Sequence, residues 1–178
     1  MRVEHRGMGK RVALLADGSN SDLYASFCAV KLARRMDAKL MSILLVVERH
    51  DGQNNSDVER WQACSPAEFL YLVSNLGNFE GIRLSYHLID EADEDSLVEF
   101  LVASKITCII MGTQDRKDFE EKQAWLSGLV QKIYGNRRWY LGDLTVFLAR
   151  PWGEKDFRKV LNQISSDCSL YPIEMVSG

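Results

Sequence analysis

No apolar run in the 178-residue chain approaches the roughly 20 residues of a membrane-spanning helix. The formal net charge is only −3, which provides no strong attraction to nucleic acid or to an anionic membrane surface. The first ten residues, MRVEHRGMGK, are basic but lead into a short strand-like run, unlike a secretory signal. These absences predict a globular cytoplasmic protein without nucleic-acid or membrane partners.

The four cysteines form no Cys-x-x-Cys pair, and the three histidines have no ligand-like spacing to any cysteine. Cys28 and Cys108 fall within apolar periodic segments, where a free cysteine behaves as a small hydrophobic residue. We therefore expect core thiols in a reducing cytoplasm and no metal site; a metal or redox role is the alternative interpretation.

No motif of a known catalytic class is present. The chain contains no His-Glu-x-x-His, no Gly-x4-Gly-Lys-[Ser/Thr] and no nucleophile elbow with an ordered Ser-His-Asp set. The sequence Asp17-Gly18-Ser19 is faintly similar to the pyrophosphatase loop of nucleotide hydrolases but does not have its paired glycines. We predict that the protein is not an enzyme, with nucleotide hydrolysis as the least favoured alternative.

Apolar segments do alternate with segments of helical periodicity. Strands are predicted over 11–16, 38–47, 82–89, 107–111 and 143–149. Ser19-x-x-Asp22 and Ser65-Pro66-x-Glu68 are typical of capping boxes, and a further helix is predicted from Phe119 to Tyr134, with Trp125, Leu129 and Ile133 as its buried stripe. The alternating residues of 82–89 indicate a half-exposed strand at a sheet edge.

This order predicts an α/β fold, a doubly wound parallel sheet with helices on both faces. We divide the chain into an N-terminal tail (1–10), an α/β domain (11–150) and a C-terminal extension (151–178). In the extension, residues 154–165 are predicted to form an amphipathic helix that packs on its own domain or covers a partner subunit. Ligands of such sheets bind beyond the carboxyl ends of the strands, where Asp17 and Gly112 both lie.

Four segments resemble, in order and in place, the corresponding strands, turn and helices of universal stress proteins: VALLADGSNSDLYASFCAVKLARRMDAKLMSILLVVE, GIRLSYHL, DSLVEFLVASKITCIIMGT and LTVFLARP. The resemblance covers residues 11–150. It implies a five-stranded sheet in the order 3-2-1-4-5, which agrees with an edge strand at 82–89.

Some members of this family bind ATP, and the resemblance implies where. Asp17 would lie near the adenosine, and the backbone of Val46 would meet the base. The phosphates would be wrapped by a Gly-x2-Gly-x9-Gly motif followed by Ser or Thr, because glycines allow close backbone approach. Gly112 matches the first glycine of that motif.

The remainder of the motif departs from the family. Asp115 stands at the second glycine, and Gly128, preceded by Ser127, lies twelve residues beyond Asp115 instead of nine. A carboxylate about 4 Å from a phosphate oxygen is repelled by roughly 4 kcal/mol at an effective dielectric constant near 20. Two effects would offset this repulsion: Mg²⁺ held by Asp115, or compensating charge from Arg116, Lys117 or Lys122.

We therefore predict a universal stress protein-like regulatory or interaction module with a degraded phosphate loop, no cofactor and an unidentified protein partner. The alternative is a Mg²⁺-dependent ATP-binding stress sensor that uses Asp17, Val46, Gly112, Arg116, Ser127 and Gly128. The resemblance further implies a homodimer through the fifth strand, Leu144–Leu148, whose backbone groups would otherwise be exposed.

Overall fold

Apolar segments of the chain form five parallel strands in a computed structural model that describes residues 9–19, 21–46, 65–136, 144–150 and 173–177. The strands are β1 (Arg11–Ala16), β2 (Lys39–Val46), β3 (Leu84–Asp90), β4 (Cys108–Gly112) and β5 (Thr145–Ala149). Their order, β3-β2-β1-β4-β5, confirms the predicted five-stranded arrangement. β1 pairs with β2 on one side and with β4 on the other, so the tips of β1 and β4 lie side by side, as expected.

A sixth strand, β6 (Ile173–Ser177), pairs antiparallel with β5. Its presence corrects two expectations. The C-terminal extension contributes a strand to the sheet, and the segment Leu144–Leu148 is not an open edge, because the backbone of β5 is already paired within the chain. The amphipathic helix predicted over 154–165 lies outside the described residues.

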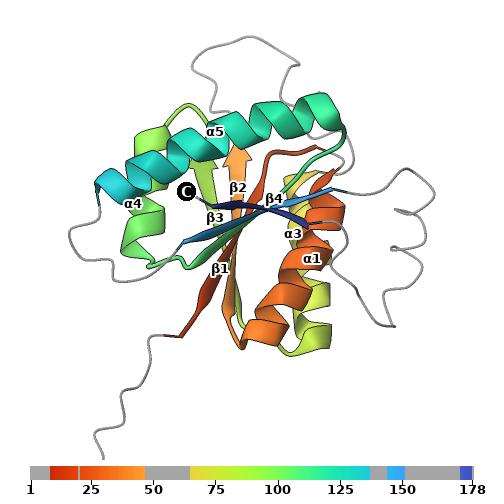
Figure 1. Ribbon diagram of the computed structural model, residues 1–178. Helices are drawn as coiled ribbons and strands as arrows, with labels where there is room; N and C mark the ends of the chain where they lie inside the picture. Colours follow the sequence, from red (N-terminus) through yellow and green to blue (C-terminus); the bar gives the residue numbers. More distant parts are fainter. Residues whose placement is uncertain (1–8, 20, 47–64, 137–143, 151–172, 178) are drawn as a thin grey trace, which may run out of the picture.

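Four described helices cover the two faces of the sheet (Figure 1). On one side lie α1 (Ser21–Met36) and α3 (Pro66–Glu80), and on the other lie α4 (Glu94–Ala103) and α5 (Arg116–Gly135). This is the doubly wound arrangement that alternating strands and helices predict. None of the described helices combines the length and apolar character needed to cross a membrane.

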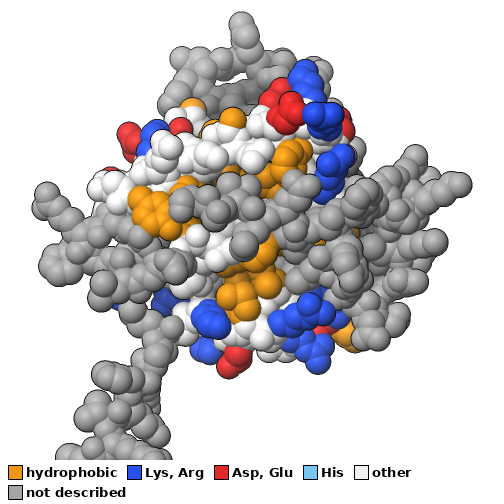
Figure 2. Space-filling model, in the orientation of Figure 1, with side chains coloured by type: hydrophobic (Ala, Val, Ile, Leu, Met, Phe, Trp, Pro, Cys, Tyr) orange, Lys and Arg blue, Asp and Glu red, His pale blue; other side chains and the backbone are white. Residues whose placement is uncertain are grey.

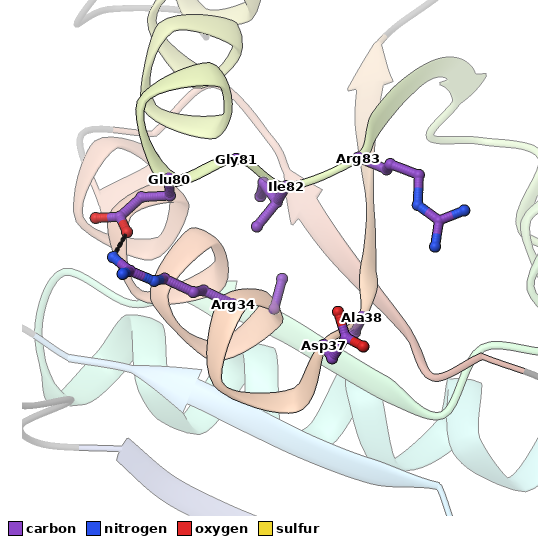
Figure 3. Close-up of a pocket in the computed structure, with 8 residues that line it drawn as sticks. Arg34, Asp37, Ala38, Glu80, Gly81, Ile82 and Arg83 are labelled. Carbon is purple, nitrogen blue, oxygen red and sulfur yellow. Dashed lines mark hydrogen bonds and ion pairs between the residues drawn. The ribbon is translucent and has the colours of Figure 1, made fainter.

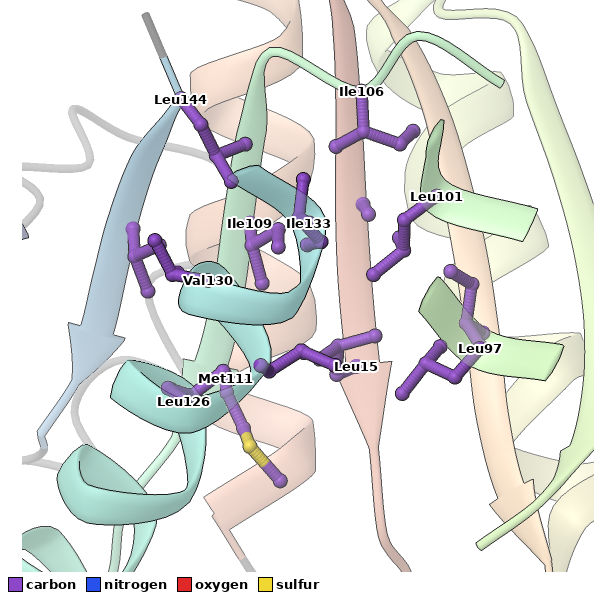
Figure 4. Close-up of a cluster of buried hydrophobic side chains, with 14 of the residues drawn as sticks. Leu15, Leu97, Leu101, Ile106, Ile109, Met111, Leu126, Val130, Ile133 and Leu144 are labelled. Carbon is purple, nitrogen blue, oxygen red and sulfur yellow. The ribbon is translucent and has the colours of Figure 1, made fainter. Parts of the chain in front are cut away.

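The core between the sheet and the pair α4 and α5 is shown in Figure 4. From α5 it takes Leu126, Leu129 and Ile133, which recur at helical spacing and are almost fully buried. Burying each such side chain contributes about 1.5–3 kcal/mol. Trp125, predicted to face inward, is only partly buried, and Leu126 takes its expected place in the core.

The helix starts were predicted with mixed success. Ser65 and Glu68 form the predicted capping box, with Glu68 N donating to Ser65 Oγ and Ser65 N donating to the Glu68 carboxylate. At the start of α1, the hydrogen bond expected from Ser19 N to the Asp22 side chain is replaced by one from a neighbouring residue. The Asp22 carboxylate accepts from Gly18 N, one residue earlier than a capping box requires, and Ser19 Oγ bonds Ser21 Oγ.

The position of β3 at the edge of the sheet confirms the prediction for 82–89. Among the described residues, Cys28 and Cys108 are buried in the core and take part in no disulfide, as expected, and burial raises the pKa of Cys108 to about 12. Other sequence features fall outside the described residues: Cys64, Cys168, the polar residues of 49–63 and the sequence Arg-Arg-Trp-Tyr at 137–140.

Candidate functional site

The turn that follows β1 is held by two carboxylates. Gly18 has φ 87°, a left-handed conformation that glycine adopts without steric cost. Ser19 N donates to Asp17 Oδ1 at 3.0 Å, and Gly18 N donates to Asp22 Oδ2 at 2.7 Å. Asp17 therefore shapes this turn through its own side chain, and Asp22, in the first turn of α1, satisfies the glycine amide.

Gly112, at the end of β4, packs directly against the beginning of α1. A Cβ atom on Gly112 would lie 2.4 Å from Ser21 O and 2.8 Å from Ser21 Oγ, too close for any other residue without a backbone shift. The structure thus explains this glycine by helix–strand packing inside the chain, with no ligand required.

Lys122 reaches from α5 into the space between these tips. Its Nζ donates to Gly112 O at 2.7 Å and lies 3.1 Å from Asp118 Oδ2 and 3.3 Å from Asp17 Oδ2. Only 7% of the residue is exposed. A buried ammonium is stable only when it is paired, and here two carboxylates and a carbonyl satisfy it. We call Asp17, Gly112, Asp118 and Lys122 the lysine cluster.

The carboxylates near this cluster differ in charge. Burial would raise the pKa of Asp17, but the Lys122 ammonium and hydrogen bonds from Ser19 more than offset it and leave the pKa below its ordinary value of 3.8. Burial, assisted by the negative charge of Asp17, raises the pKa of Asp22 to about 8. At neutral pH Asp17 is therefore ionised and Asp22 carries a proton.

The β4–α5 connection uses its backbone amides internally. Asp118 Oδ2 accepts from Gln114 N at 2.8 Å, and Asp115 Oδ1 accepts from Asp118 N at 2.9 Å. Asp115 is the N-cap of α5 and has extended backbone, with φ −144° and ψ −177°. A backbone phosphate cradle works through free amides that point at the anion, and here side-chain carboxylates already accept from the amides of Gln114 and Asp118.

The structure brings together some of the residues predicted for ATP and separates others. Asp17 and Gly112 meet through Lys122, and Val46 ends β2 at the same edge of the sheet, with its carbonyl accepting from Glu91 N. Ser127 and Gly128 lie well inside α5, about 17 Å along the axis from its first residue at 1.5 Å per residue. They are not part of a loop at the strand tips.

Arg116 and Lys117 were predicted as compensating charges, but both are highly exposed and pair along α5 with Glu120 and Glu121. Figure 2 shows acidic and basic side chains mixed at the end of α5 where the helix begins. Of the three candidate cations, only Lys122 enters the site. The sequence could have indicated that Lys122 is buried, because it lies four residues before Leu126 and seven before Leu129, on the buried stripe of the helix.

A triphosphate in the pose that the resemblance implies does not fit these residues. The amides at Gln114 and Asp118 are bonded to carboxylates, the glycine that should close the loop is helical, and Lys122 lies between the strand tips. Within the described ranges, no group of three or more His, Cys, Asp or Glu side chains is arranged to hold a metal ion.

A separate cavity of about 210 Å³ lies at the opposite end of the sheet, beside the turns that follow α1 and α3. Ala38 and Ile82 are among its lining residues, and an ion pair joins Arg34 and Glu80, which also line it (Figure 3). Hydrogen bonds from Lys31 and Arg34 outweigh partial burial and hold the pKa of Glu80 below its ordinary value. The cavity contains none of the residues predicted from the sequence for ATP.

No protein-family model matches the chain, and no curated protein matches it. Solved structures similar to it include a universal stress protein in complex with cAMP, with 18% identity, TM-score 0.49, and coverage of 79% of this chain and 96% of that one. Another is a universal stress protein from Archaeoglobus fulgidus, with 14% identity, TM-score 0.48, and coverage of 78% and 92%. The protein from Archaeoglobus fulgidus in complex with dAMP shares 13% identity at TM-score 0.45, with coverage of 78% and 95%. At these identities and TM-scores the similarity carries no argument about function, which therefore rests on the geometry of the site.

Proposed function

We propose that the protein is a regulatory or interaction module of universal stress type that does not use ATP and is not an enzyme. The observation that carries the proposal is the position of Asp118. Its carboxylate accepts from Gln114 N and pairs with Lys122 Nζ, the two kinds of donor that a phosphate group would need. Asp118 thus acts as an internal anion in place of a phosphate.

Two further features support this proposal. Lys122 also pairs with Asp17, so the residue expected near an adenosine is engaged by the chain itself. Asp115 caps α5 at the position where ATP binders have a glycine, and its negative charge opposes a phosphate. The role in stress adaptation comes from the sequence resemblance, and a protein partner is the remaining route by which such a module would act.

The direct test is calorimetric titration of the full chain with ATP, with and without Mg²⁺. We expect no saturable heat up to millimolar nucleotide. The matched variant is Asp118→Ala, which removes the internal anion and leaves Lys122 and the Gln114 amide available, so we expect it to gain weak binding of ATP or inorganic phosphate. Tight, Mg²⁺-dependent binding of ATP by the unmodified protein would overturn the proposal.

Nucleotide binding at the same tip is the second candidate, and Lys122 is the observation that favours it. An ammonium paired with two carboxylates at the beginning of α5 could exchange one of them for a phosphate oxygen. This mechanism requires Asp118 to move, so it predicts that ATP changes the environment of α5. An adenine absorbance in protein purified without added nucleotide would favour this candidate.

The proposal that the protein is not an enzyme rests on the same contacts. Asp17 is paired with Lys122, and the Ser19 hydroxyl bonds Ser21 Oγ at 2.7 Å, so both groups are already engaged in contacts within the chain. We expect phosphate release from ATP no faster than in a buffer control. Release above that control and abolished by Asp17→Ala would show a hydrolase.

A further inference from the structure

β3 ends the sheet on the side opposite β6. Among the described residues it pairs only with β2, so along its other side the backbone amides and carbonyls have no strand partner. Proteins usually protect such edges with charged residues, proline or bulges. Apart from Asp90 at its last position, this strand contains no proline, lysine, arginine or acidic residue, so its central residues lack these protections against pairing with another strand.

Apolar side chains are exposed beside this edge. Leu88 is 65% exposed and Tyr86 is 49% exposed. The Tyr86 hydroxyl lies 3.1 Å from Ser74 Oγ of α3, so the alternate residues Tyr86 and Leu88 belong to the side of the sheet that α3 covers. We call the open edge of β3 with Tyr86 and Leu88 the β3 surface.

The β3 surface is complementary to itself. In an antiparallel pair centred on His87, Tyr86 of one copy lies opposite Leu88 of the second copy, and the reverse pair forms across a two-fold axis. Aromatic–aliphatic pairs directly opposite one another stabilise antiparallel strands. Both pairs lie on the same side of the joined sheet, because residues that face each other across a ladder share a face.

The charges at the two ends of the strand fit the same register. Centring on His87 places Arg83, which precedes β3, opposite Glu91 of the second copy, which follows β3. Arg83 is exposed and makes no ion pair with the described residues, and it lies next to Lys39 across the β2–β3 ladder. In this register a carboxylate of the second copy lies beside these two neighbouring cations, which is a complementary arrangement of charge.

We propose that the β3 surface is a homodimer interface, in which β3 of two copies pair antiparallel about a two-fold axis at His87. The interface would join the two sheets edge to edge. It differs from a contact through the fifth strand, whose edge β6 already covers. It does not depend on whether the protein binds a nucleotide.

Sedimentation velocity of the full chain over a range of concentrations tests the interface. We expect a dimer whose dissociation constant rises at least tenfold in Leu88→Lys, because the substitution places two like charges beside the apolar pairs. Phe79→Lys is the matched control: Phe79 is 72% exposed but lies on α3 outside the strand, and we expect no change. A monomer at all concentrations, or a dimer that Leu88→Lys leaves intact, would refute the interface.

Cysteine cross-linking tests the register, in a background where Cys64 and Cys168 are replaced by serine. His87→Cys places two thiols opposite each other at the axis, within disulfide reach, and we expect rapid covalent dimer formation on oxidation. Ser85→Cys separates the two thiols by about 13 Å at 3.3 Å per residue, and we expect little cross-linking. Equal cross-linking of the two variants would contradict the register, and thermal unfolding of each variant would verify that both are folded.

Discussion

The two connections that leave the tips of β1 and β4 share one hydrogen-bond pattern but differ in burial and in their charged partners. In each, a carboxylate in the first turn of the next helix accepts from a backbone amide four residues earlier: Asp22 from Gly18 N, and Asp118 from Gln114 N. Asp22 is 2% exposed and has a pKa raised to about 8, whereas the Asp118 side chain is 25% exposed and pairs with Lys122. The local motif therefore does not fix the charge of the carboxyl group, because burial raises the pKa of Asp22.

The largest effect on this comparison is expected when the Lys122 ammonium is removed. In Lys122→Met, the apolar stem is kept but Asp17 and Gly112 O lose their buried partner, so we expect a loss of about 4 kcal/mol in the free energy of unfolding. Urea denaturation monitored by circular dichroism measures this change in the free energy of unfolding. Lys117→Met, at an exposed pair with Glu121, is the control and should change stability by less than about 0.5 kcal/mol. Similar losses in the two variants would mean that the lysine cluster contributes no special stability.

The second prediction concerns the two glycines of the degraded motif. Gly112→Ala forces a Cβ against Ser21 O and should cost about 3 kcal/mol, because backbone atoms must move. Gly128→Ala meets nothing within 4 Å inside α5 and should stabilise the protein by about 0.5–1 kcal/mol. Thermal unfolding of both variants measures whether Gly112→Ala loses stability and Gly128→Ala gains it. If both lose stability, the assignment of Gly128 to a helix interior is wrong.

The third prediction uses the pH dependence of stability to test the raised pKa of Asp22. The pKa of Asp22 is raised on folding, so the native state binds more protons than the unfolded chain, and stability falls as pH rises from the ordinary value of 3.8 towards about 8. The slope is on the order of 1 kcal/mol per pH unit. Asp22→Asn keeps an acceptor for Gly18 N and should flatten the profile measured by urea denaturation between pH 5 and 8. Asp17, whose pKa is lowered, acts in the opposite sense and only as pH falls below 3.8. An unchanged profile in Asp22→Asn would show that Asp22 is ionised in the folded protein.

The smallest effect is expected at the cap of α5. Asp115→Ala removes the acceptor of Asp118 N, and because the site is exposed we expect a loss of about 0.5–1 kcal/mol. Asp93→Ala, which removes the corresponding acceptor at α4, should lose a similar amount in the same urea titration. A gain of stability in Asp115→Ala would mean that repulsion from Asp118 outweighs the cap.

The sequence predicted the sheet well because interior strands are apolar on both faces. The predicted strand 11–16 coincides with β1, and Gly112 and Asp17 meet at one edge as topology requires. β6 was missed because an edge strand of five residues has no distinctive pattern. Its pairing with β5 also removed the reason for a dimer through Leu144–Leu148.

The candidate site was harder to predict because it depends on where one flexible side chain points. Lys122 was considered only as one of three cations, and Ser127 and Gly128 matched a motif by residue type although they lie within a continuous helix. Periodicity could have placed Lys122 on the buried stripe, but not its contact with Asp17, which is more than one hundred positions away in the chain. Such contacts follow from the packing of α5 against the sheet.

The pairing of β1 with β4 also has a kinetic consequence. Arg11 N bonds Thr107 Oγ1 across 96 positions, so the centre of the sheet cannot close until a long loop has been brought together. The entropy of that closure slows folding, whereas β1, α1 and β2 can associate early through near neighbours. Lys122 follows β4 in the chain, and its contacts connect α5 to β1 and β4, which pair late in folding. These contacts therefore lower the unfolding rate more than they raise the folding rate.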